Sequence, residues 1–218
     1  MRSQARSGQS PLESSNRRLL KTLITDGTVK LNWAPILESQ PALLPLLQTM
    51  HEGAHRVLPL HDGRPDVDYE VDVELSELMH VLRVTENDIS CGSPYLLPGA
   101  RTECTSRQDG GALRVGVVWK AGEWDDRRSI PCELLQRLAQ VPGVEWLLFQ
   151  RGPALAEWQH CFGHVPQMHG ILEEAREMRR LDLLISVDTC SAHLAGALGV
   201  AVWTLLPFDG DWRWHLTT

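Results

Sequence analysis

The chain has 218 residues, of which 43% are hydrophobic and 22% charged, a composition typical of globular proteins. Its formal net charge of -7 argues against nucleic acid or an anionic membrane surface as a partner, since both bind basic surfaces. No apolar run approaches the ~18 residues of a membrane span, and residues 1–15 lack the apolar core of a secretory signal. We therefore expect a cytoplasmic protein that has no membrane span.

The five cysteines are scattered along the chain and form no CxxC pair. An odd, scattered set without a signal peptide is typical of reduced thiols in a cytoplasmic protein, and a zinc site would need tighter clustering. We therefore expect that the cysteines form neither disulfides nor a metal centre. They are Cys91, Cys104, Cys132, Cys161 and Cys190.

The first half of the chain divides into three segments by composition. Residues 1–18 are rich in Ser, Gln and Arg and poor in apolar side chains, which predicts a disordered leader. Residues 19–85 predict a partial N-terminal α/β domain, with strands at 33–38, 55–60 and 67–73 and helices at 41–50 and 74–84. Residues 86–111 hold Gly, Pro and Ser without sustained periodicity, which predicts an interdomain linker.

From residue 112 to 218 apolar strands and amphipathic helices alternate regularly. The pattern predicts strands at 113–119, 145–150, 181–187 and 200–206, and helices at 131–140, 153–159, 170–180 and 189–198. Such alternation indicates βαβ units on a parallel sheet, and therefore a Rossmann-like α/β domain. A doubly wound domain usually carries more helix after its last strand, so we expect a C-terminally truncated domain.

Three predicted strand ends are unusually polar, at residues 120–129, 150–153 and 188–193. Ligands of open α/β sheets bind at the carboxyl ends of the strands. If the sheet is parallel, the three loops converge on one edge and form the expected binding site.

The third of these loops begins with an acid that follows a fully apolar strand. Asp188 is expected to cap the next helix, and Thr189 and Ser191 add hydroxyls in a first turn that favours anions. His193 lies one turn further on, on the face that Thr189 shares. The alternative is that Asp188 only caps the helix and that His193 is a satisfied, partly buried side chain.

The first loop places three cations within nine residues of a strand end. Lys120, Arg127 and Arg128 are the residue types that bind phosphate, because arginine forks onto phosphate oxygens and lysine supplies a point charge. The alternative is a solvated loop in which both arginines pair with Asp125 and Asp126, at under ~1 kcal/mol a pair.

Several common motifs are absent from the chain. It has no GxGxxG, no GxxxxGK[ST], no GxSxG and no HExxH, which argues against dinucleotide dehydrogenases, P-loop NTPases, serine hydrolases and zinc proteases. Near the C-terminus, two roles are open for Trp212 and Trp214. Their rings either stack on a base or sugar or pack in the core as anchors for a following helix.

Three sequence blocks between Leu113 and Trp214 resemble one family. VGVVWKAGEWDDRRSIP, WLLFQRGP and LDLLISVDTCSAHLAGALGVAVWTLLPFDGDWRW are similar to the C-terminal half of glycosyltransferase family 9, the heptosyltransferase-like family, in the variant often fused to tetratricopeptide repeats. Weaker similarity, in LESQPALLPLL, HRVLPL and DYEVDVELSEL, extends to the later part of that family's N-terminal domain.

The resemblance implies a two-domain GT-B fold and an inverting sugar transfer that uses neither metal nor cofactor. The donor would be a nucleotide-diphosphate sugar, and the acceptor a glycan, lipid or protein. Asp188, Thr189 and His193 would contact the donor's phosphates and sugar hydroxyls, while Lys120 and Arg128 would neutralise the leaving diphosphate. Gln150 and Gly152 would line the nucleotide pocket, and Arg127 and Ser191 complete the expected binding set.

The family's general base is an Asp near the start of the N-terminal domain, and the weak candidate here is Asp26. Two alternatives to an active transferase stay open. One is a catalytically inactive binding or scaffold module, or a fragment, that keeps the donor fold. The other is a sugar-nucleotide epimerase of the same broad architecture.

Overall fold

The structure is a computed structural model, and it describes part of the chain. The described residues are 36–49, 56–60, 67, 71, 73–74, 77–85, 94–96, 111–122, 125–158, 162–210 and 214. The expected leader at 1–18, Asp26, Trp212 and most of the expected linker at 86–111 lie outside them. Within the described part, no helix is long and apolar enough to cross a membrane.

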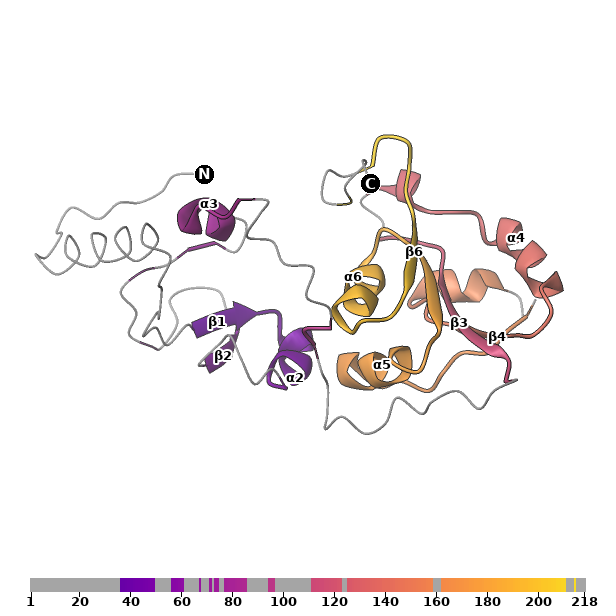
Figure 1. Ribbon diagram of the computed structural model, residues 1–218, viewed down its shortest axis with the longest axis horizontal. Coiled ribbons are helices and arrows are strands. Elements are labelled where there is room, and N and C mark those ends of the chain that lie inside the picture. The colour runs from indigo at the N-terminus through magenta and orange to yellow at the C-terminus, as the bar shows by residue number, and fades with distance from the viewer. Residues whose placement is uncertain are drawn as a thin grey trace, which may run out of the picture.

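The N-terminal region contains a two-stranded parallel sheet and short helices (Figure 1). β1 (Ile36–Ser39) pairs with β2 (Arg56–Pro59), and these strands overlap the ones predicted at 33–38 and 55–60. The helix expected at 41–50 is instead a 3-10 helix (Pro41–Leu43) followed by one turn of α-helix, α2 (Leu44–Leu47). Pro45 explains the break, because it has no N–H to donate to the carbonyl of Pro41.

The strand predicted at 67–73 is wrong where it can be checked. Val67, Val71 and Val73 lie outside any strand, and Val71 is exposed. A strand needs a partner as well as alternation, and the acidic residues between these valines are disfavoured in sheets. The helix predicted at 74–84 is present but shorter: α3 (Leu78–Leu82) ends at Arg83, which adopts a left-handed conformation with φ 53°.

The C-terminal region is built on a four-stranded sheet in the order β4-β3-β5-β6, with every pairing parallel. This confirms the predicted α/β class with a parallel sheet. The strands are β3 (Leu113–Val118), β4 (Val144–Leu148), β5 (Leu183–Val187) and β6 (Val202–Leu205). The chain runs from β3 to β4 on one side and then crosses to β5 on the other, so β3 and β5 flank the topological switch point where ligands of such sheets bind.

The expected helices between the strands are present, and some of them are 3-10 rather than α. They are α4 (Cys132–Leu135), the 3-10 helices Gln136–Gln140 and Pro153–Trp158, α5 (Ile171–Met178) and α6 (Cys190–Ala197). The structure adds a 3-10 helix (Asp126–Arg128) in the loop after β3, which the sequence pattern does not predict.

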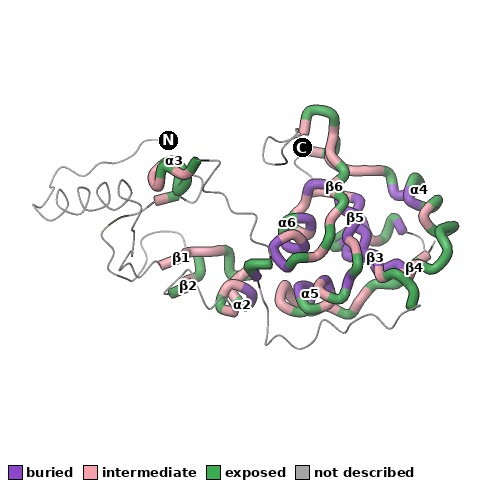
Figure 2. The backbone as a smooth tube through the Cα atoms, viewed as in Figure 1, coloured by how far each residue is buried: buried purple, intermediate pink, exposed green. Residues whose placement is uncertain are grey.

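The sheet is covered on both faces, as Figure 1 and Figure 2 show, and its strands hold much of the buried surface. One face packs on α5 and α6 through Val118, Leu147, Leu184, Met178 and Leu194, with Leu46 of α2 joining this cluster. The other face packs on α4 and the 3-10 helix Pro153–Trp158 through an aromatic cluster, which consists of Trp119, Trp146, Trp158 and Phe162.

Gly116 of β3 lies against the first face, where two leucines leave no room for a side chain. A Cβ there would stand 2.7 Å from a methyl of Leu181 and 2.8 Å from one of Leu184. We expect Gly116→Val to lower the free energy of unfolding by about 1–3 kcal/mol, the usual cost of overpacking a core. Urea denaturation followed by circular dichroism measures this free energy.

Gly196→Ala is the matched control, because a Cβ at that position in α6 meets nothing within 4 Å. An alanine inside a helix should stabilise the protein by about 0.5–1 kcal/mol relative to glycine. A Gly116→Val protein as stable as the wild type would contradict the packing described for β3.

Candidate functional site

The candidate site lies where β3 and β5 end, at the switch point of the sheet. Val118 and Ser186 are register partners in these strands, so the two strands reach the carboxyl edge at the same level. Lys120 follows β3, and Asp188 and Thr189 follow β5 directly before α6. The prediction that the first and third loops converge is confirmed by a direct contact between them.

That contact joins two residues 60 positions apart. Nη1 of Arg128 donates to the backbone carbonyl of Asp188 at 3.0 Å and lies 3.4 Å from its carboxylate Oδ2. Both side chains are largely buried. The alternative of a solvated loop, in which both arginines pair with Asp125 and Asp126, therefore does not hold for Arg128. Its guanidinium contacts the neighbouring strand end instead.

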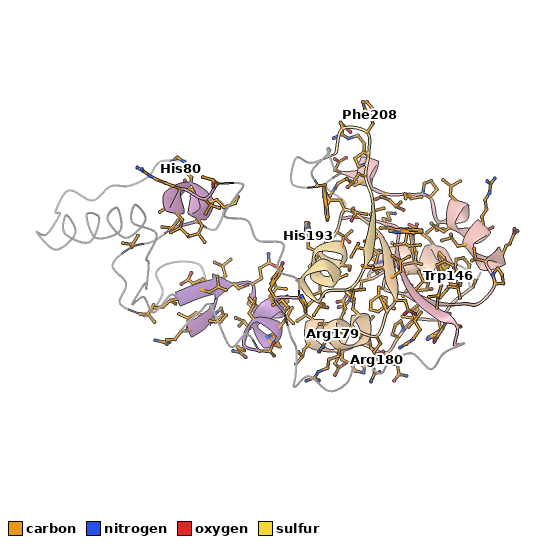
Figure 3. All side chains as sticks on the ribbon, viewed as in Figure 1. His80, Trp146, Arg179, Arg180, His193 and Phe208 are labelled. Atoms are coloured by element: carbon orange, nitrogen blue, oxygen red, sulfur yellow. The ribbon has the colours of Figure 1, made fainter. Side chains whose placement is uncertain are left out.

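Asp188 is 6% exposed, and a second side chain lies near its carboxylate. Nε2 of His193 lies 3.7 Å from its Oδ1, which is too long for a hydrogen bond. Trp214 stacks on the His193 ring with 4.6 Å between centroids and 21° between planes. Figure 3 shows His193 on α6, so Asp188, His193 and Trp214 form a layered group at the start of that helix.

The expectation that Asp188 caps α6 is wrong. Thr189 is the N-cap residue, and its side chain makes no capping bond. The Thr189 hydroxyl lies 3.0 Å from the Ser186 hydroxyl, and the Ser186 hydroxyl donates to the carbonyl of Val187. The physical reason is competition for the carboxylate, because charged Arg128 is a stronger partner for Asp188 than neutral backbone N–H groups.

The other two predicted cations are paired with carboxylates. Nζ of Lys120 lies 2.7 Å from Oε1 of Glu157. Arg127 binds Asp125 through two nitrogens at 3.0 and 3.1 Å, contacts Asp209 at 3.1 Å, and is 72% exposed at its side chain. The Arg127 guanidinium lowers the pKa of Asp125. For Arg127 the structure thus agrees with the alternative of a solvated pair with Asp125.

Gln150 joins the ends of β3 and β4 and is buried. Its Oε1 accepts hydrogen bonds from the backbone N–H groups of Trp119 and Lys120 at 3.0 and 2.9 Å. Its Nε2 donates to the carbonyls of Lys120 and Arg151 at 3.3 and 3.2 Å. The amide therefore holds the backbone of both loops, while Gly152, with φ +70°, is exposed in the turn that follows.

Ser191 faces a residue that the sequence reasoning missed. Its hydroxyl lowers the pKa of the Glu174 carboxylate as a hydrogen-bonding neighbour. Glu174 is 4% exposed on α5 and lies 2.7 Å from Nη2 of Arg151. Arg151 stands between two residues that were predicted to bind, so its place in the QRGP block was an available signal. Glu174 had no such signal, because an acid in the first turn of a helix is commonplace.

Burial raises the pKa of Glu174 above its usual 4.5, although Arg151 and Ser191 partly offset this. The folded protein therefore holds this proton more tightly than the unfolded chain, and the group's contribution to stability falls as pH rises from 4.5 through the raised value. As the pH increases over this interval, we expect the unfolding free energy of Glu174→Gln to rise relative to that of the wild type. Urea denaturation at a series of pH values measures the difference.

Glu177→Gln is the control for this pH series, since Glu177 lies one turn further along α5 and pairs with the exposed Arg180 at 2.6 Å. Its stability relative to wild type should show much less dependence on pH in the same interval. A constant difference between Glu174→Gln and wild type would contradict the burial of a charged carboxylate at this position.

Among the described residues, no group of three or more His, Cys, Asp or Glu side chains is arranged to hold a metal ion. The described cysteines, Cys132 and Cys190, form no disulfide. Burial and the Glu174 charge raise the pKa of Cys190, and the nearby Arg151 charge acts in the opposite direction. Asp26, the candidate general base, lies outside the described residues.

No protein-family model matches the chain, and no curated protein matches its sequence. Part of it is similar to solved structures of E. coli heptosyltransferase WaaC. The structure with ADP-2-deoxy-2-fluoro heptose is 22% identical with a TM-score of 0.38, and the match covers 48% of this chain and 35% of that chain. The structure with ADP is 23% identical with a TM-score of 0.38, covering 48% and 34%. The chain thus spans about a third of the length of these structures.

Proposed function

We propose that the carboxyl edge of β3 and β5 binds a nucleotide-diphosphate sugar and that the protein is a glycosyltransferase. The observation that carries the proposal is the junction of Arg128 with Asp188, which places a cation from one strand end against the acid and the helix start of the next. The switch point of a parallel sheet is where such ligands bind. The sequence blocks around these residues resemble family 9, including its tetratricopeptide-associated variant.

The cations of the site would bind the diphosphate. Lys120 pairs with the half-exposed Glu157, and Arg127, whose own side chain is exposed, pairs with Asp125 and with the exposed Asp209. Ion pairs of exposed side chains contribute little to stability. A diphosphate offers more charge and more acceptor oxygens than a single carboxylate, so it can replace these partners at little cost. Arg128 is more firmly held, and it would orient the donor together with Asp188.

The transfer would proceed with inversion and without metal. The acceptor hydroxyl attacks the anomeric carbon from the face opposite the diphosphate, a base takes the hydroxyl proton, and the diphosphate leaves with the electron pair of the broken bond. Lys120 and Arg128 would stabilise the negative charge that develops on the leaving oxygen. Asp188, Thr189 and His193 would hold sugar and phosphate groups, and Asp26 is the candidate base.

The proposed domain arrangement is that of a two-domain GT-B protein. Residues 19–85 would belong to the acceptor side, 86–111 to the linker, and 112–218 to the donor side. The described part of the linker is attached to the donor domain, because the N–H groups of Tyr95 and Leu96 both donate to the carbonyl of Ala197 at 3.0 Å. The acceptor would be a glycan, a lipid or a protein.

Titration calorimetry with ADP, UDP and their sugar conjugates tests donor binding. We expect heat with at least one nucleotide and a loss of about 10–100-fold in affinity in Arg128→Gln, because a hydrogen bond to a charged group contributes about 1.5–3 kcal/mol. Arg137→Gln, on the exposed 3-10 helix after α4, should bind as the wild type does. A wild-type protein that binds no nucleotide would contradict the proposal.

A second measurement separates an enzyme from an inactive module with the donor fold. Release of free nucleotide from the sugar conjugate, with and without candidate acceptors, reports transfer or donor hydrolysis. Binding accompanied by turnover supports the transferase. Binding with no turnover on any acceptor supports the inactive module, and exchange of the sugar's stereochemistry on the intact conjugate supports an epimerase.

A further inference from the structure

A buried carboxylate on α5 connects the loop after β4 with the first turn of α6. Glu174 is 4% exposed, its carboxylate lies 2.7 Å from Nη2 of Arg151, and the Ser191 hydroxyl lowers its pKa as a hydrogen-bonding neighbour. Cys190, beside Ser191, is close enough for the Glu174 charge to affect its thiol. Three elements that are far apart in sequence thus meet at one side chain.

The two residues that Glu174 contacts, Arg151 and Ser191, lie at the candidate donor site. Glu174 itself lies on the neighbouring helix, α5. α5 and α6 lie beside each other on one face of the sheet (Figure 1). Ser191 is the second residue of α6, and Asp188 and Thr189 immediately precede that helix. Fixing Ser191 therefore fixes the direction in which α6 begins and the backbone from which Asp188 extends.

The cost of burying the carboxylate indicates what it contributes. A buried ion pair adds little net stability, since an apolar pair of similar size is often as stable or more so. Its partners here lie on two elements, however: the carboxylate forms an ion pair with Arg151 on one loop, and the Ser191 hydroxyl on the neighbouring helix is its hydrogen-bonding neighbour. Apolar packing would fill the same space without setting the orientation of either partner.

We infer that Glu174 is a positioning residue for the donor site, which holds the first turn of α6 through Ser191 and the loop after β4 through Arg151. The effect that we expect on nucleotide binding rests on the proposed function. Glu174 then acts on the donor site through Ser191, and Arg151 belongs to the same unit.

A double-mutant cycle on nucleotide affinity tests the inference. We expect Glu174→Gln to weaken ADP binding about tenfold, which is well within the ~100-fold that a 1 Å misplacement can cost. Ser191→Ala should weaken it similarly, and the double variant should be no weaker than either single one, because both changes break the same link. Glu177→Gln, one turn along α5, should bind ADP as the wild type does. Urea denaturation checks that each variant is folded.

A second readout needs no nucleotide. Removing the Glu174 charge should speed alkylation of Cys190 by iodoacetamide at neutral pH about threefold, since the thiolate fraction rises when a neighbouring negative charge is lost. Peptide mapping by mass spectrometry separates Cys190 from the other cysteines, and Glu177→Gln should leave its rate unchanged.

The outcomes distinguish this inference from the proposed function. If wild type binds ADP and Glu174→Gln binds it equally well, or if the two substitutions are additive, Glu174 is not a positioning residue although the donor site stands. If the wild type binds no nucleotide, the proposed function fails. In that case faster alkylation in Glu174→Gln supports the placement of the Glu174 charge beside the first turn of α6, and an unchanged rate overturns it.

Discussion

Asp188→Ala is expected to abolish measurable nucleotide binding and to lower the unfolding free energy by about 3 kcal/mol, since removing one partner of a buried ion pair is strongly destabilising. The side chain left behind is Arg128, 14% exposed, whose Nη1 lies 3.4 Å from the Asp188 carboxylate. His193 would lose the same carboxylate, 3.7 Å from its Nε2. Calorimetry with ADP and urea denaturation measure the two effects.

Asp182→Ala is the matched control, because Asp182 directly precedes β5 while Asp188 directly follows it. Its Oδ2 accepts a hydrogen bond from the N–H of Arg114 at 2.8 Å at an exposed position. We expect this change to cost about 0.5–1.5 kcal/mol and to leave nucleotide binding unchanged. Equal loss of binding in both variants would show a general effect of the strand rather than a role for Asp188.

Trp158→Ala is expected to produce the largest loss of stability, about 3–5 kcal/mol, the range for truncating a large buried aromatic residue. Trp158 is 4% exposed, stacks on Trp119 at 4.7 Å between centroids, and meets Phe162 at 4.6 Å. Its indole N–H also donates to the carbonyl of Phe162 at 2.7 Å. Truncation would open a cavity and remove the partner of that carbonyl.

Trp158→Phe should lie between wild type and Trp158→Ala, because phenylalanine refills part of the cavity but cannot donate the hydrogen bond. Trp203→Ala is the control for removing an indole as such, since Trp203 is 63% exposed on β6. That change should shift the unfolding free energy by no more than about 0.5 kcal/mol. A similar loss at both tryptophans would contradict the assignment of Trp158 to the core.

Much of the C-terminal region could be predicted from local pattern. The apolar runs at β3 and β5 and the helical spacing of α5 and α6 identify these four elements. In each of them the pattern of buried apolar residues is complete within a short stretch of chain. The parallel sheet follows from the alternation of these elements. Where the periodic stretch held an interruption, as at Pro45, the predicted helix was too long.

The candidate site was predicted in its residue types more than in its pairings. Arg128 and Asp188 could be selected from two strand ends, yet nothing local says that they contact each other rather than Asp126 or the backbone of α6. The strand at 67–73 failed for a related reason, since alternation does not provide a partner strand. Glu174 was missed because its burial comes from its neighbours in the fold rather than from its own sequence context.

The sequence by itself determined where strands and helices form and which strand ends are polar, because hydrophobic periodicity and backbone preferences act over a few residues. Only the tertiary structure decided the order β4-β3-β5-β6, the contact between Arg128 and Asp188, and the link from Arg151 through Glu174 to Ser191. Each of these features depends on which of several partners, distant in the chain, a strand or side chain contacts. The packing of the whole domain determines those contacts, because it brings some charges together and removes others from water.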